Sequence, residues 1–317
     1  MTGNLRNSMS KHEYFLKNHL SKISKDADQA ELVALRFGKS RASTGVRDDA
    51  IADTLEENYS SGINLDEEAW QSHETSLDSA SSQIIEELER RAEALGALYP
   101  FKVTGDVIEY HQSDSLIYEF LLCASLSPSL TTGEYTGFPR KFELISMLLT
   151  ANFLGTNVRC CHTGFPNEYR GFRAAAEVAI ADSHELLWQP DPDLPEGGPK
   201  LGDAGVDYIL WKDFGCGRFV GQPFFLGQCA CGNDWDSKLN DVSARFLKWF
   251  ARLKVEPSKI FALPFVVPEA KLREVSVEAG IVMDRIRLVK SLEGGTHFKA
   301  DEWRESLFET MCLVAAA

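Results

Sequence analysis

The sequence predicts an α/β fold in which helices flank a mixed sheet, preceded by a helical N-terminal region. From residue 140 onward, segments with helical periodicity alternate with short apolar runs in the order helix, helix, strand, strand, helix, strand, helix. A loop rich in proline and glycine at 189–200 interrupts this series. The first 80 residues are polar, rich in Ser and Asp and weakly periodic, which indicates a loosely helical or partly disordered region.

These differences in composition predict three parts. Residues 1–80 form the polar N-terminal region, residues 81–135 a helical segment suited to regulation or oligomerisation, and residues 136–317 the α/β domain.

The individual elements follow from periodicity and from helix and strand breakers. The helical candidates are 12–24, 48–59, 81–95, 113–125, 140–154, 169–184, 239–253, 268–279 and 301–314. We expect Ser81 or Ser82 to cap the third of these helices, which stops before Pro100. The strand candidates are 101–110, 206–211, 223–229 and 260–267. Pro264 indicates an edge or a bulge in the last strand, and 281–288 fits either a strand or a helix.

Composition excludes several classes of protein. Seven cysteines without regular spacing argue against a disulfide framework, and no apolar run approaches the roughly 18 residues of a membrane span. The N-terminus lacks the apolar core of a signal peptide, so we expect a cytoplasmic protein without a membrane partner. A net charge of −14 argues against a module that holds nucleic acid by bulk electrostatics. It argues less against an enzyme whose acidic site is neutralised by divalent cations.

Acidic residues, glycines and two apolar strands meet in the stretch 202–238. Asp203 and Asp207 lie in a glycine-rich turn before the first strand, and Gln228 lies at the end of the second. Because paired strands lie about 4.8 Å apart, such side chains can sit together at a sheet end and hold a metal ion. Glu143 is conspicuous as the interior carboxylate of the apolar helix at 140–154.

These residues follow a known pattern. The run from Gly202 to Asp207 fits G-D-x-G-x-D, Gln228 ends the next apolar strand, and Glu143 follows Phe142 on a preceding helix. Residues 138–253 therefore resemble the restriction-endonuclease-like PD-(D/E)xK nucleases, closest to their Mrr-like branch, whose strand pair reads roughly GDxGxD and then QxK. The resemblance implies a restriction-endonuclease-like sheet core for the nuclease-like domain.

The resemblance also implies a metal site and a set of catalytic residues. Glu143, Asp207 and Gln228 would surround one or two Mg²⁺ or Mn²⁺ ions, which lower the pKa of a bound water and steady charge on the scissile phosphate. The family places a lysine two residues after the glutamine, where this chain has Ala230. Lys238 is the expected replacement and would act with Asp207 and Gln228.

Lys212 is a second candidate for the missing lysine. Strand alternation disfavours it, because its offset of five residues from Asp207 gives it the opposite face.

The implied function is a Mg²⁺-dependent endonuclease that hydrolyses phosphodiester bonds in DNA. By association alone, the resemblance also suggests a role in restriction or prokaryotic anti-phage defence. A second defence-system protein would then be a candidate partner, and the chain could form an oligomer. The missing lysine supports the alternative of a catalytically degenerate nuclease-fold subunit that acts as a sensor or interaction protein. A third option is another metal-assisted hydrolase that uses the same carboxylates.

Simpler interpretations stand beside these. The aspartates fit ordinary turn chemistry, Glu143 fits an exposed helix stripe, and Gln228 fits a buried structural amide. The pair Cys229 and Cys231 hints at zinc, but the spacing favours plain reduced thiols. The other zinc ligands considered are Cys160, Cys161, His162 and Cys216. Asp284, Arg285 and Arg287 fit an internal ion pair better than a phosphate contact.

Overall fold

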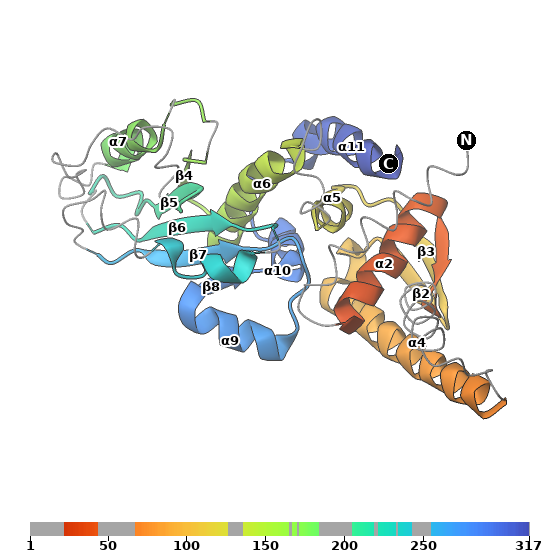
Figure 1. Ribbon diagram of the computed structural model, residues 1–317. Helices are drawn as coiled ribbons and strands as arrows, with labels where there is room; N and C mark the ends of the chain where they lie inside the picture. Colours follow the sequence, from red (N-terminus) through yellow and green to blue (C-terminus); the bar gives the residue numbers. More distant parts are fainter. Residues whose placement is uncertain are drawn as a thin grey trace. The chain divides into compact units, whose positions relative to one another are not determined.

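A computed structural model gives the fold of this chain (Figure 1). It describes residues 22–43, 67–125, 136–164, 167–169, 171–183, 205–218, 221–232, 234–242 and 255–316. The predicted helix at 48–59, the loop at 189–200, most of 12–24 and 239–253, and both Gly202 and Asp203 lie outside these residues. The chain forms two compact units, one of Met1–Cys123 with Leu307–Ala317 and the other of Ala124–Ser306. The first division falls within the predicted segment 81–135.

The first unit combines helices with a small antiparallel sheet. Its elements are α2 (Lys22–Phe37), β1 (Lys39–Arg41), α4 (Glu67–Leu95), η1 (Gly96–Leu98), β2 (Phe101–Thr104), β3 (Val107–Tyr110) and most of α5 (Ile117–Ala124). The strands lie in the order β1-β3-β2. The final helix, α11 (Ala300–Ala316), runs across the division between the two units.

Two sequence predictions in this unit need correction. The expected single strand at 101–110 is a hairpin, because Gly105 adopts a φ of 60° and reverses the chain between β2 and β3. The helix expected to begin at Ser81 or Ser82 begins at Glu67 instead. Those serines lie on a partly or fully exposed part of α4, where serine costs a helix little.

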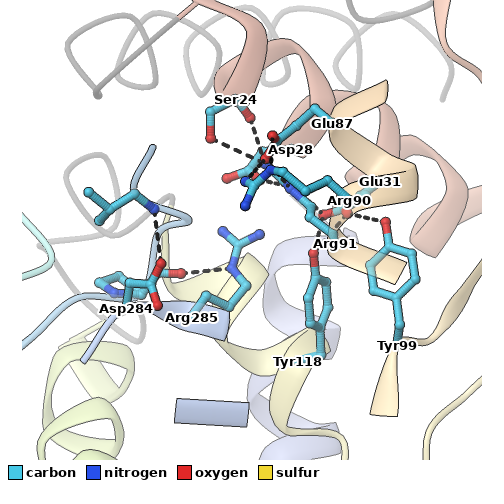
Figure 2. Close-up of polar contacts among 12 residues, drawn as sticks. Ser24, Asp28, Glu31, Glu87, Arg90, Arg91, Tyr99, Tyr118, Asp284 and Arg285 are labelled. Carbon is cyan, nitrogen blue, oxygen red and sulfur yellow. Dashed lines mark hydrogen bonds and ion pairs between the residues drawn. The ribbon is translucent and has the colours of Figure 1, made fainter. Parts of the chain in front are cut away.

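A buried ionic network joins α2 to α4, as Figure 2 shows. The side chain of Arg91 is fully buried and donates to Asp28 Oδ1 at 2.7 Å, to Glu31 Oε2 at 3.0 Å and to Glu87 Oε1 at 2.9 Å. Burial works to lower the pKa of Arg91, but the charges of Glu31 and Asp28 outweigh it and raise the pKa well above its usual value. The network therefore keeps its charges inside the unit.

Two tyrosines complete this network around the fully buried Glu31 (Figure 2). The Tyr99 hydroxyl donates to Glu31 Oε1 at 2.6 Å, and the Tyr118 hydroxyl donates to the same oxygen at 2.8 Å. The carboxylate thus connects α2 to the segment after η1 and to α5.

The second unit is built around a five-stranded mixed sheet. Its elements are α6 (Gly137–Leu154), β4 (Val158–His162), α7 (Phe172–Ser183), β5 (Tyr208–Lys212), β6 (Phe224–Cys229), η4 (Trp235–Lys238), β7 (Ser258–Ala262), α9 (Glu269–Ala279), β8 (Ile281–Met283), α10 (Arg285–Lys290) and η5 (Ser291–Glu293). The strand order is β4-β5-β6-β7-β8. The pairs β4–β5 and β5–β6 are antiparallel, whereas β6–β7 and β7–β8 are parallel. The predicted α/β fold with a mixed sheet, flanking helices and a helix near the N-terminus is confirmed.

The sheet differs from the sequence prediction in three places. Strand β4 was not predicted, because its polar sequence lacks an apolar alternation. Strand β7 lies inside the sheet rather than at an edge and ends at Ala262, so Pro264 interrupts nothing. The ambiguous segment 281–288 contains both a strand and a helix, and Asp284 divides them by accepting from the Arg287 backbone N–H as an N-cap.

The two faces of the sheet differ in what covers them. On one face Tyr208 is fully buried, and its hydroxyl lies 3.1 Å from that of Thr150 on α6. Its ring occupies the space where a side chain on Gly227 would lie, so only glycine fits there. The other face packs against α7 through an apolar cluster. That cluster comprises Cys161, Phe172, Ala175, Ala176, Ala179, Val206, Ile209, Trp211, Phe224, Leu226 and Val242. None of the helices that the structure describes is long and apolar enough to cross a membrane.

Neighbouring arginines provide a test of the buried network. Arg91→Met removes a buried cation that pairs with the carboxylates of Asp28 and Glu31, so we expect a loss of about 3–5 kcal/mol in unfolding free energy. Arg90→Met removes the same charge from the exposed pair with Glu87 and should cost less than about 1 kcal/mol. Urea denaturation of both variants measures the difference, and equal effects would contradict a structural role for Arg91.

Candidate functional site

Asp207 is a buried carboxylate at the bend before β5. Its side chain accepts a hydrogen bond from the Cys229 backbone N–H at 2.6 Å, and its own N–H donates to Gly227 O at 2.8 Å. Its carbonyl oxygen accepts from the backbone N–H groups of Thr163 and Gly164, both at 2.8 Å. Asp207 therefore ties the end of β6 and the residues after β4 to the start of β5.

Gln228 presents a buried carbonyl oxygen without a partner. The residue is only 5% exposed, and its Oε1 has no hydrogen-bond partner within the part of the chain that the structure describes. Leaving a buried acceptor unsatisfied costs about 1–3 kcal/mol, so this oxygen indicates a place for a cation or a water. Strand alternation gives the Gln228 side chain the face opposite to Gly227 and Cys229.

Glu143 reaches the same end of the sheet from α6. Its Oε2 lies 3.2 Å from Nε2 of His162, the last residue of β4. The register pairs His162 with Tyr208, so both side chains face α6. Glu143 is therefore paired with a histidine and does not belong to an exposed polar face of α6.

Glu143 and Asp207 act on a common neighbour, the Cys229 thiol. Burial raises the pKa of this thiol well above its usual value, and the negative charges of Asp207 and then Glu143 raise it further. The two predicted carboxylates therefore lie within electrostatic range of one atom. Gln228 precedes Cys229 on β6, and its side chain extends from the opposite face of the sheet.

The structure separates the lysines from these residues. Lys238 lies in η4 with Nζ 3.7 Å from Asp234 Oδ1, and among the described residues it has no recorded contact with Asp207 or Gln228. Lys212 lies at the far end of β5, where its Nζ donates to Leu154 O at 2.7 Å and caps α6. Ala230 is buried, and its N–H donates to Ala262 O.

Sequence reasoning missed the pairing of His162 with Glu143. The sequence indicated His162 only as a candidate zinc ligand, because it did not predict β4 and so could not show that His162 faces α6. Burial raises the pKa of Cys160 to about 11 and that of Cys161 to about 12, so these two thiols carry their protons at neutral pH in the metal-free chain.

Oxygen donors at this sheet end fit Mg²⁺ better than they fit zinc. In the described part of the chain, no group of three or more His, Cys, Asp or Glu side chains is arranged to hold a metal ion. Mg²⁺ needs fewer protein ligands, because it keeps several waters and takes one or two carboxylates plus substrate oxygens. The Asp207 carboxylate is such a ligand, and Gln228 Oε1, which has no hydrogen-bond partner among the described residues, adds a neutral carbonyl oxygen.

No protein-family model, curated protein or solved structure matches this chain. The chemistry of the site therefore rests on the chain's own residues.

The raised pKa of Cys229 gives a pH-dependent prediction. At pH 8 we expect iodoacetamide to label Cys229 far more slowly than the exposed Cys216, because burial and the neighbouring carboxylates keep Cys229 protonated. Asp207→Asn removes one of those charges and should speed the labelling of Cys229. Peptide mass spectrometry measures both rates, and equal labelling of Cys229 and Cys216 would refute the assignment.

The same shift predicts a loss of stability in alkali. Above about pH 8.5 the unfolded chain releases the Cys229 proton while the folded chain keeps it, so the unfolding free energy should fall as the pH rises further. Cys229→Ser, whose hydroxyl does not titrate in this range, provides the control.

Proposed function

We propose that this protein is a Mg²⁺-dependent endonuclease that hydrolyses phosphodiester bonds in DNA. The observation that carries the proposal is a fixed, buried carboxylate, Asp207, at the same sheet end as the buried Gln228 Oε1, which has no partner in the described part of the chain. Glu143 adds a second carboxylate within electrostatic range of Cys229. DNA as the substrate, and a role in restriction or anti-phage defence, rest on the resemblance to PD-(D/E)xK nucleases.

Each residue has a separate task in this proposal. Asp207 and Gln228 would hold the ion through oxygen atoms, and the Cys229 N–H fixes the orientation of the Asp207 carboxylate. Glu143 would add a further oxygen donor from the α6 side of this sheet end, the side opposite to that of the Gln228 side chain. When bound, Mg²⁺ supplies Lewis-acid chemistry that activates water and stabilises charge on the phosphate.

A specific observation favours a second candidate, a nuclease-fold subunit that does not cleave. Lys238, the expected replacement for the missing lysine, pairs with Asp234, and Ala230 is buried in the lysine's usual place. In this alternative the protein would act as a sensor or interaction partner.

Plasmid nicking with matched aspartate variants tests the proposal. We expect Mg²⁺- or Mn²⁺-dependent nicking that Asp207→Asn reduces by more than about 100-fold, since even loss of a residue that supports a metal ligand costs about 10- to 100-fold. Asp213→Asn is the control, because Asp213 follows the other end of β5 and, within the described ranges, its carboxylate accepts only from the nearby Gly215 N–H. Absence of nicking by the wild type, with both variants indistinguishable from it, would overturn the endonuclease.

Calorimetric titration with Mn²⁺ separates the two candidates. An intact site binds Mn²⁺ and loses that binding in Asp207→Asn but not in Asp213→Asn. A subunit that lacks the metal site shows no binding for either variant to lose.

A further inference from the structure

The contact between Glu143 and His162 joins helix α6 to the end of strand β4. Glu143 Oε2 on α6 lies 3.2 Å from His162 Nε2 at the end of β4, and the two side chains are only 19% and 16% exposed. A carboxylate on a helix surface samples several rotamers unless a neighbour holds it. An imidazole N–H held by a strand is such a neighbour.

Gly164 makes room for this pair. A β-carbon on Gly164 would overlap Glu143 Oε2 and would lie 3.0 Å from His162 Nε2. Gly164 does not have a positive φ, so its backbone conformation is open to other residues. A β-carbon here would therefore make the end of the Glu143 side chain shift.

The same short segment also holds Asp207. The backbone N–H of Gly164 donates to Asp207 O at 2.8 Å, and so does that of Thr163. Residues 162–164 therefore fix the backbone of one predicted metal ligand and the side chain of another. A shift of this segment would move both together.

We infer that His162 is a positioning residue that holds the Glu143 carboxylate for the metal ion, with Gly164 providing the space. The inference rests on the proposed metal-dependent function. Carboxylates that bind metals are generally held by a hydrogen bond from a second residue, and loss of such a partner costs about 10- to 100-fold in metal affinity or activity. His162 fills this role through Nε2, which bonds one carboxylate oxygen and orients the other.

Two substitutions of His162 separate positioning from packing. His162→Gln retains an N–H donor at a similar reach, whereas His162→Leu retains the bulk but has no donor. For Mn²⁺ alone, measured by calorimetry, we expect His162→Leu to weaken binding by about 10- to 100-fold and His162→Gln to stay near the wild type. A purely structural histidine would give equal affinities for the two variants.

A matched pair of glycine variants tests the space around the carboxylate. Gly164→Ala should displace Glu143 and weaken Mn²⁺ binding as His162→Leu does. Gly171→Ala is the control, because a β-carbon there meets no atom within 4 Å. Equal Mn²⁺ affinities for the two alanine variants would count against the inference.

NMR of ¹⁵N-labelled histidine supplies a readout that needs neither metal nor activity. We expect a hydrogen-bonded Nε2–H signal of His162 in the metal-free wild type, and its loss in Glu143→Leu. An Nε2–H signal that is insensitive to Glu143 overturns the inference.

The outcomes distinguish the inference from the function on which it rests. If the wild type binds Mn²⁺ and Asp207→Asn does not, unchanged affinity in His162→Leu overturns the positioning role alone. If the wild type neither binds Mn²⁺ nor nicks DNA, the proposed function fails, and the positioning role fails with it.

Discussion

The end of the sheet depends on the hydrogen bonds of Asp207. Its carbonyl oxygen, N–H and carboxylate reach backbone groups that follow β4 and that belong to β6, so one residue connects three strands. A buried carboxylate that accepts a backbone N–H is held more strongly than a neutral acceptor would be. Asp207 fixes the strand ends that lie between Glu143 and Gln228. The positions of these two side chains relative to each other therefore depend on Asp207.

The sequence could predict the parts of the site that lie in strongly patterned elements. Asp207 and Gln228 flank apolar strands whose existence follows from composition alone, and α6 is apolar enough to be recognised as a helix. Strand β4 could not be recognised, because its two buried residues, Val158 and Cys161, lie three positions apart and do not alternate, and its sequence contains no run of large apolar residues. The pairing of Glu143 with His162 was hidden for the same reason.

The orientation of Gln228 shows a second limit. Alternation fixes which residues of β6 share a face, but the sequence does not say which face meets α6. That information comes from Tyr208, whose ring fills the space beside Gly227 and places Cys229 on the α6 side. A glycine opposite an aromatic residue indicates which face of the strand meets α6 only once the register of β5 and β6 is known.

The first unit shows how polar composition can conceal order. Helix α2 buries Ser24, Asp26, Asp28 and Glu31, so its inward face has little of the apolar periodicity that predicts a helix. The cation that makes this burial possible, Arg91, lies 60 residues further along the chain than Glu31. Long-range ion pairs of this kind leave no local pattern, and the segment therefore resembles a loose polar region until the partner is in place.

The contrast between the two candidate lysines bears on catalysis. Lys212 is held at the C-terminus of α6 by its bond to Leu154 O, where the helix dipole also favours a positive charge. Lys238 forms only a long, partly exposed pair with Asp234, and such pairs contribute about 0–1 kcal/mol. A phosphodiester carries the same single negative charge as a carboxylate, so it can replace Asp234 as the partner of Lys238 at little cost. Under the proposed function, Lys238 is therefore the one of the two lysines that a phosphate group can recruit.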